Sequence, residues 1–347
     1  MNNTLLKRDS WADILKAIAI VSVVIGHTLY TGNVFKAVYL FHLPLFFFVA
    51  GYLFNFSRYE GNSELLIARS AKRLLVPCVV MSLIMYDFYF WFSAGILSVL
   101  YGSGVPVSLR LGGLIFTISP ILLMMWFLYC LFVMRLLLWG FLTVTKRLRT
   151  AVWINLALAL VVARAGIMMG EKFPLPWSFD LACVGLFFAY AGYCVRSFRV
   201  RQSSLSVKHA VLGLIGAVLI YLDWQHGQLY LNDREYRAPF IALLGALSCI
   251  GLIGCLTEMW VRKALRESKL YRWLTTGFVY IGANSLVVMF VHIMLWEGRN
   301  GWWLVLLRLA VSLAAAELLA RNAMLSEIFG AKTWKQIKQE CAGSKID

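Results

Sequence analysis

Three of the chain's five histidines lie inside strongly apolar stretches. His27, His42 and His292 are each surrounded by hydrophobic residues, where an ionisable side chain is costly to bury. An imidazole titrates near neutral pH, so it can take a proton from one group and give it to another. These positions therefore predict general acid–base chemistry. The alternative is a structural role, in which each ring bonds a backbone carbonyl between helices.

Two charged residues precede His27 in the same apolar stretch. Asp13 and Lys16 stand one turn apart on one helical face, and Lys16 comes eleven residues before His27. Eleven residues make three helical turns, which place the lysine and the histidine on one side of the helix about 16 Å apart. The pattern fits either a local Asp13–Lys16 ion pair or a functional cation on the helix that carries the histidine.

A pair of arginines precedes the third apolar stretch. Arg69 and Arg73 are one helical turn apart, just before Pro77. Paired guanidinium groups bind phosphate well, so we expect a phosphate clamp at the cytoplasmic mouth of the protein. The alternative is the ordinary positive charge of a cytoplasmic loop.

The elements that position these residues are transmembrane helices. Hydrophobic residues make up 61% of the 347 positions and charged residues only 14%, which excludes an ordinary soluble domain. A span needs roughly 20 apolar residues. The sequence predicts an all-α, polytopic bundle of about ten spans, near residues 11–30, 36–56, 74–95, 119–142, 151–169, 178–195, 209–223, 238–257, 276–296 and 302–320. Residues 96–118 are only moderately apolar, and a re-entrant or interfacial piece is compatible with them.

The positions of the basic residues predict the orientation. With the amino terminus inside, 23 of the 33 lysines and arginines fall on the cytoplasmic side and six on the outer side. The net charge of +16 therefore indicates membrane topology and not nucleic-acid binding. We expect residues 1–321 to form the bundle and 322–347 a basic tail, with both termini in the cytoplasm of a bacterium and the bundle in its inner membrane. His27, His42 and His292 then all lie within roughly 10 Å of the outer boundary.

The cysteines predict neither disulfides nor a metal site. The seven are scattered, six of them lie in apolar stretches, and no CxxC pair occurs. We expect packing roles for them and no bound metal.

Together these residues resemble the membrane acyltransferase-3 family. The resemblance rests on the spacing from Lys16 to His27, the run from Phe41 to Phe48 that leads to Gly51, and the arginine–proline segment 73–77. It also rests on Trp126 with the two residues after it, and on Asn284 and Ser285 leading to His292. The chain is most similar to short members that acetylate bacterial surface polysaccharides. It departs from them at Ala50, where many relatives have serine, so this position supplies no hydroxyl.

The resemblance implies transfer of an acetyl group from cytoplasmic acetyl-CoA to a sugar hydroxyl of a lipid-linked or surface glycan. It implies that His27 is the catalytic histidine and Lys16 its basic partner, with Asp13, His42 and His292 in the same site. Arg69 and Arg73 would bind the donor, and Trp126, Asn284 and Ser285 the acceptor. His27 would act either as a base or as the carrier of a transient acetyl group. Neither the acceptor sugar nor the oligomeric state follows from the sequence.

The competing function is transport of lipid-linked sugars. A transporter would also carry polar residues inside its spans. It would often show two related halves with broken helices at matching positions, and the sequence shows no such repeat.

The predicted topology can be tested with reporter fusions. Fusions after Arg110, Gly170, Asn232 and Arg299 should all report an external location, because the charge bias places each of these loops outside. A fusion after Arg149 is the internal control. An internal signal from any of the four would overturn the layout around that loop.

Overall fold

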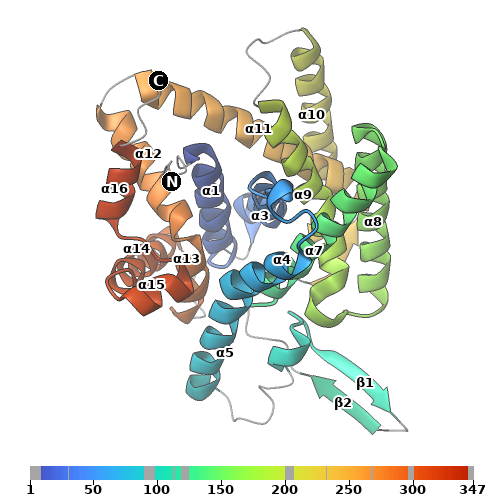
Figure 1. The fold of residues 1–347 in the computed structure, drawn as a ribbon, viewed down its shortest axis with the longest axis horizontal. Coiled ribbons are helices and arrows are strands. Elements are labelled where there is room, and N and C mark those ends of the chain that lie inside the picture. The colour runs from blue at the N-terminus through green and yellow to red at the C-terminus, as the bar shows by residue number, and fades with distance from the viewer. Residues whose placement is uncertain are drawn as a thin grey trace. The chain divides into compact units, whose positions relative to one another are not determined.

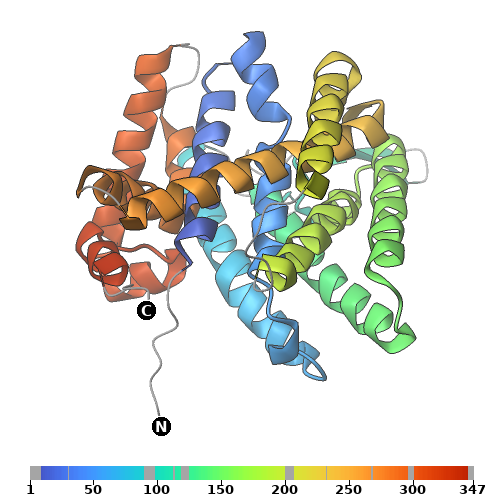
Figure 2. The same ribbon diagram turned by 90° about the horizontal axis from the view of Figure 1, so that it is seen from above.

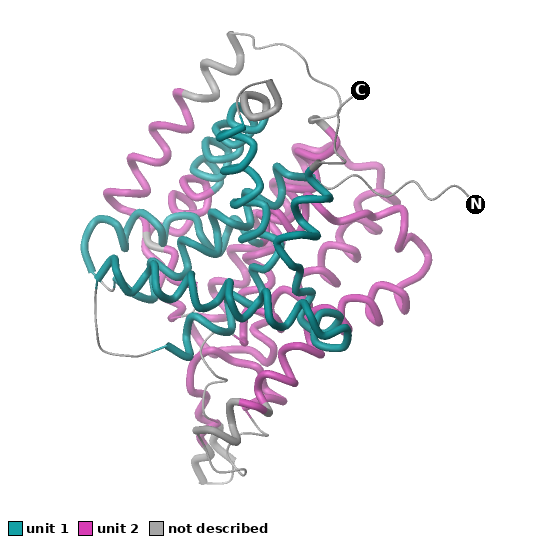
Figure 3. The backbone as a smooth tube through the Cα atoms, turned by 90° about the vertical axis from the view of Figure 1, so that its left-hand side faces the viewer, with its two compact units in different colours: residues 1–46, 247–347 teal, residues 47–246 magenta. Residues whose placement is uncertain are grey.

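The computed structural model describes residues 9–29, 31–89, 98–111, 114–118, 125–199, 207–231, 233–266, 269–295 and 301–342. The chain divides into two compact units (Figure 3). Unit 1 contains Met1–Phe46 and Leu247–Asp347, and unit 2 contains Phe47–Ala246. Helices α3 (His42–Tyr52) and α11 (Pro239–Arg266) belong partly to each unit.

The other elements of unit 1 are helical: α1 (Ser10–Gly26), α2 (Gly32–Tyr39), α12 (Lys269–Ala283), α13 (Ser285–Val291), the 3₁₀ turn η4 (His292–Met294), α14 (Trp302–Leu319), α15 (Ala323–Phe329) and α16 (Trp334–Ala342). Those of unit 2 are η1 (Phe56–Arg58), α4 (Ser63–Ser70), the π-helical turn η2 (Ala71–Leu75), α5 (Val76–Tyr89), β1 (Val107–Leu111), β2 (Leu114–Ile118), α7 (Met125–Leu148), α8 (Val152–Lys172), η3 (Pro176–Ser178), α9 (Phe179–Arg199), α10 (Val207–His226), β3 (Gln228–Tyr230) and β4 (Glu235–Arg237).

Helix α1 is the centre of unit 1. Its first turn is capped by Asp9, whose carboxylate accepts hydrogen bonds from the backbone of Trp11 and Ala12. The helix contacts α12, α13 and α14 (Figures 1 and 2). Against α12 the approach is backbone to backbone, since a Cβ atom added at Gly282 would overlap the carbonyl oxygen of Asp13.

The carboxy-terminal segment packs into unit 1. Ile337 of α16 is fully buried in a cluster with Ile14 of α1 and with Val279 and Tyr280 of α12. The backbone N–H of Trp334 donates to the carboxylate of Glu317, which also accepts from the Tyr280 hydroxyl. These contacts tie the tail to the helices that carry two of the sequence-predicted site residues, Asp13 and Lys16.

Unit 2 is built around α7, α8 and α9. Helix α8 packs along α9, and α7 packs on α9 as well (Figure 1). The unit 2 part of α3 approaches α9 closely, because an added Cβ at Gly51 would overlap the Ala189 carbonyl and one at Gly192 the Phe48 carbonyl. The glycine that ends the phenylalanine-rich run is therefore required by packing.

A buried ion pair fixes the start of α9. Asp180 is fully buried and accepts from Nε of Arg234 at 2.7 Å and from its second terminal nitrogen at 3.3 Å. Arg234 lies in the turn between β3 and β4 at φ +56°. A buried charge is stable only when it is paired in this way, so the pair holds the β3–β4 hairpin on the helix.

The helical bundle is confirmed, but ten spans are not. Among the described residues, six helical segments are long and apolar enough to cross a membrane: 32–52, 125–148, 152–172, 176–197, 239–261 and 302–319. Helices α12 and α13 make a seventh if the pair, bent by 63°, counts as one span. The spans predicted near 11–30, 74–95 and 209–223 correspond to α1, α5 and α10, which lie outside this set.

The predicted helical fold holds apart from two short β-hairpins. Strands β1 and β2 form an antiparallel hairpin in which Val107 pairs with Ile118 and Leu111 with Leu114. This hairpin occupies the moderately apolar region that was compatible with a re-entrant piece. Strands β3 and β4 form a second hairpin, with Gln228 opposite Arg237. The strands of the first hairpin contain β-branched residues, and each strand of the second contains a tyrosine. Such residues favour extended backbone, but these stretches are too short to stand out from the helical pattern around them.

The close α1–α12 contact predicts a glycine requirement. Gly282→Ala should lower the thermal midpoint of the purified protein, because overpacking at a rigid backbone contact costs about 1–3 kcal/mol. Gly277→Ala in the same helix is the matched control: its added Cβ would meet nothing within 4 Å. Alanine should be neutral or favourable there. Thermal unfolding in detergent measures both, and equal midpoints for the two variants would contradict the packing argument.

Candidate active site

The structure brings two of the predicted histidines together in unit 1. His27 is the C-cap residue that follows α1, and His292 begins η4 at the end of α13. Their ring centroids are 5.7 Å apart, with the ring planes inclined by 58°. His292 is fully buried. Two imidazoles at this distance can contact the same small polar group.

The hydrogen bonds of His292 fix its tautomer. Its Nδ1 lies 2.7 Å from the Val288 carbonyl, one helical turn earlier. A carbonyl oxygen can only accept, so Nδ1 carries the hydrogen and Nε2 carries a lone pair in the neutral ring. That Nε2 is buried and, among the described residues, has no hydrogen-bond partner. It is therefore available to accept a hydrogen bond or a proton.

His42 is anchored in the same way. Its Nδ1 lies 2.8 Å from the Val38 carbonyl, its side chain is buried, and its ring meets Tyr39 edge-on at 4.6 Å. It is close enough to His27 for their charges to interact. The three histidines thus converge, as their common depth in the sequence predicted. The structural alternative also holds in part, since two of the rings bond backbone carbonyls.

His27 differs from the other two because its ring is not anchored. Among the described residues, no hydrogen-bond partner contacts this ring. Its backbone is fixed instead: its N–H donates to the Val23 carbonyl at 2.9 Å, and its own carbonyl accepts from Arg308. A ring with a fixed backbone and uncommitted nitrogens is suited to exchange protons with a bound molecule.

Arg308 is the main residue of this site that the sequence analysis did not assign. It lies in α14, is 3% exposed, and donates to the carbonyls of His27 and Leu295 and to the Thr28 hydroxyl. Thr28 in turn donates to the Val24 carbonyl at 2.6 Å. The available signal was an arginine in the middle of an apolar helix, which is costly unless it has a specific partner.

Lys16 and Asp13 form the predicted ion pair at the other end of α1. The two groups are 2.6 Å apart, and the Asp13 carboxylate is more deeply buried than the lysine. Along the helix they remain about 16 Å from His27. The structure therefore does not bring Lys16 to the histidines, and any influence on them acts through the helix.

Asn284 lies at the break between α12 and α13. Its amide donates to the carbonyls of Tyr280 and Lys332, and its oxygen accepts from the Lys332 backbone at 2.8 Å. The amide is buried and engaged with the carboxy-terminal segment. Ser285, the first residue of α13, is partly exposed.

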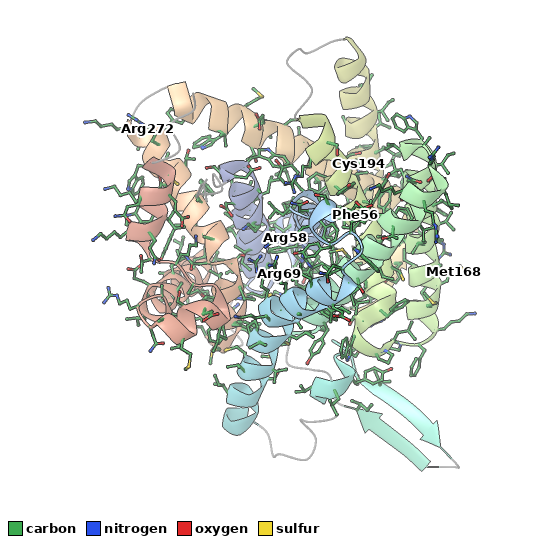
Figure 4. The ribbon with its side chains drawn as sticks, viewed as in Figure 1. Phe56, Arg58, Arg69, Met168, Cys194 and Arg272 are labelled. Atoms are coloured by element: carbon green, nitrogen blue, oxygen red, sulfur yellow. The ribbon has the colours of Figure 1, made fainter. Side chains whose placement is uncertain are left out.

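The predicted arginine pair lies in unit 2, at the junction of α4 and η2. Arg69 lies in the last turn of α4 (Figure 4), and Arg73 is exposed within the π-helical turn. One terminal nitrogen of Arg69 is buried and, among the described residues, has no hydrogen-bond partner. π-Helical turns often mark functional sites, because they shift side chains out of the regular helical register.

A third arginine, unassigned from sequence, joins this pair. Arg135 of α7 donates from Nε to the Ser70 hydroxyl at 3.1 Å, and its guanidinium carbon lies 5.4 Å from the centroid of the Phe54 ring. It is close enough to Arg73 for the two positive charges to interact. Three cations gathered at one helix junction favour an anionic ligand.

Two predictions remain, the acceptor-binding role of Trp126 and the absence of a bound metal. Trp126 is buried in α7 with its ring edge-on to Phe127, at a centroid distance of 5.9 Å. Within the part of the chain that the structure describes, no group of three or more His, Cys, Asp or Glu side chains could hold a metal ion.

Comparison with known proteins gives one family match and two relatives. Residues 9–320 match the profile of the family described as "Acyltransferase domain". The chain is 28% identical to the nodulation protein NolL of Mesorhizobium japonicum over 304 residues, covering 82% of this chain and 76% of the relative. It is 26% identical to the NolL of Sinorhizobium fredii over 239 residues, covering 62% and 58% of the two chains. No solved structure matches.

Proposed function

We infer, because this chain belongs to the acyltransferase domain family, that it is a membrane O-acyltransferase of bacterial polysaccharides. The proposed donor is cytoplasmic acetyl-CoA, and the proposed acceptor is a sugar hydroxyl of a lipid-linked or surface glycan. The observation that carries this proposal is the pair of imidazoles, His27 and His292, whose ring centroids lie 5.7 Å apart within the matched residues. The proposed location is the inner membrane, with both termini in the cytoplasm.

The reaction needs a base near a weak nucleophile. As the sugar oxygen attacks the thioester carbon, a C–O bond forms and the C–S bond breaks. The hydroxyl proton passes to an imidazole nitrogen of His27 and then to the departing thiolate of CoA. No group is oxidised or reduced. The lone pair on Nε2 of His292 is suited to hold the hydroxyl, or the protonated ring of His27, by a hydrogen bond.

The burial of His42 and His292 beside the half-buried His27 supports this role. Water would compete with the sugar hydroxyl for the acyl group, and a closed apolar setting excludes it. His42 and His292 hold their rings through backbone carbonyls, so their orientation does not depend on the ligand. A transient acetyl group on His27 is the stepwise form of the same chemistry.

The donor is proposed to bind at the arginine cluster of unit 2. Acetyl-CoA carries several phosphate charges, which guanidinium groups bind through charge-assisted hydrogen bonds. Arg69 has a buried terminal nitrogen available, and Arg73 is exposed beside it. Arg135, held by Ser70, adds a third positive charge.

A transporter remains the competing function, since the bent α12–α13 pair is the kind of break that transporters use. Mass spectrometry of surface glycans from cells with and without the protein separates the two. Loss of an acyl mass from a glycan that still reaches the surface supports the transferase. Loss of the glycan itself from the surface would instead support transport.

The donor site predicts a specific kinetic change. Arg69→Gln together with Arg73→Gln should raise the apparent KM for acetyl-CoA by about tenfold or more, because each charge-assisted bond contributes about 1.5–3 kcal/mol. The matched control is Arg147→Gln with Arg149→Gln, two exposed arginines of unit 2 whose loss changes the net charge equally. If both double variants show the same KM for acetyl-CoA, Arg69 and Arg73 do not bind the donor and serve only as the positive charge of a cytoplasmic loop.

The proposed role of His27 as the base predicts a large loss of acylation rate when this residue is replaced. His27→Gln keeps a side chain that can hydrogen-bond but cannot accept the proton, so acylation should fall by roughly 10²–10⁴-fold. Membrane accumulation should be retained, because the ring has no hydrogen-bond partner among the described residues. The assay is incorporation of labelled acetyl groups into glycan by inside-out membrane vesicles.

Two further variants sharpen this test. His292→Asn keeps a donor for the Val288 carbonyl and removes only the Nε2 lone pair, so it should also lower the rate. His226→Gln, at an exposed histidine that ends α10, should not. Near-normal acylation by His27→Gln would show that His27 is structural.

A further inference from the structure

We propose that Arg308 is a positioning residue that holds His27 and His292 in register. This proposal rests on the proposed acyl transfer. The guanidinium connects two segments of unit 1 that are far apart in the sequence: the end of α1, which carries His27, and the chain just after η4, which carries His292.

The hydrogen bonds define this connection. One terminal nitrogen of Arg308 donates to the His27 carbonyl at 2.6 Å and to the Thr28 hydroxyl at 3.0 Å. Nε and the other terminal nitrogen donate to the Leu295 carbonyl at 3.1 and 2.9 Å. Each of these acceptors lies within three residues of one of the two histidines.

Only a guanidinium fits this arrangement. Its donors point in fixed directions within one plane, so one group can bond two separate segments at once. A lysine has a single ammonium on a flexible stem and would satisfy one segment at the expense of the other. The bonds also supply donors to carbonyls freed where each helix ends, which would otherwise be left unpaired in an apolar environment.

The connection acts on geometry and leaves the imidazole nitrogens free. Arg308 bonds the backbone of His27, not its ring, and it bonds Leu295 beyond His292. A shift of about 1 Å in the relative position of two reacting groups can lower a rate about 10²-fold. Loosening Arg308 should therefore slow the chemical step and leave donor binding unchanged.

Labelled acetyl incorporation by inside-out vesicles, measured against acetyl-CoA concentration, tests this. Arg308→Lys should lower the apparent kcat about 10–100-fold and change the donor KM less than about twofold. The matched control is Arg164→Lys, an arginine of α8 in unit 2. The proposal is overturned if the two lysine variants behave alike, or if Arg308→Lys raises the donor KM as much as it lowers kcat.

A second pair of variants decides the case even if Arg308→Lys fails to accumulate. Thr28→Val removes one acceptor of Arg308 with almost no change in shape, whereas Thr28→Ser keeps the hydroxyl. The Thr28→Ser variant should keep the parental rate of acetyl incorporation, and the Thr28→Val variant should show a rate several-fold lower. Equal rates for valine and serine would overturn the role of Arg308.

A crosslinking readout separates this proposal from the proposed function. In a chain whose native cysteines are replaced, His27→Cys and His292→Cys should be joined efficiently by a short thiol crosslinker. Adding Arg308→Lys should lower the yield, and an unchanged yield would overturn the proposal. This result does not depend on any acyl transfer. Absence of acetyl incorporation by the parent protein, in contrast, would reject only the proposed function.

Discussion

Backbone carbonyls freed at helix ends must find hydrogen-bond donors, and in an apolar bundle water does not supply them. This constraint governs unit 1, where α1 ends at Gly26 and η4 ends at Met294, each one residue before a carbonyl that Arg308 bonds. Arg308 satisfies this requirement at both ends, because it donates hydrogen bonds to the carbonyls of His27 and Leu295. The charge of the arginine is thus retained in an unfavourable place because its donors are needed there. The two histidines lie where they do because these helix ends are joined.

The same constraint sets the state of the histidine rings. In a helix the carbonyl four residues earlier is within reach of a side chain at the helix end, and His292 and His42 both use it. Thr28 does the same with Val24. The bond orients each ring and places the hydrogen on Nδ1, which leaves Nε2 as the acceptor. One hydrogen bond therefore both anchors the ring and leaves Nε2 as an acceptor, so the structural role of these histidines is compatible with the proposed acid–base role.

Much of this arrangement could be predicted from the sequence. Apolar stretches located the helices, because hydropathy alone marks them. The helical rise then placed the three histidines at one depth, which predicted that they lie in the same region. Contacts between elements could not be obtained in this way. The sequence shows that Arg308 lies in an apolar stretch, but which carbonyl it bonds depends on how α14 packs on α1. Asn284 illustrates the same limit, since its amide bonds Lys332, 48 residues away. The two hairpins were missed because strands of three to five residues leave little periodicity to detect.

The helix break that places His292 is held from both sides. Helix α13 has seven residues, too few to be stable by itself. At its start, the side chain of Asn284 accepts a hydrogen bond from the backbone of Lys332 in the carboxy-terminal segment. Beyond its end, the carbonyl of Leu295 accepts a hydrogen bond from Arg308. The segment 322–342 therefore contributes to the same geometry from outside the apolar helices, through Asn284 and through Ile337 in the α1–α12 cluster. A short helix fixed at both ends can keep a bend of 63° that its own hydrogen bonds would not maintain.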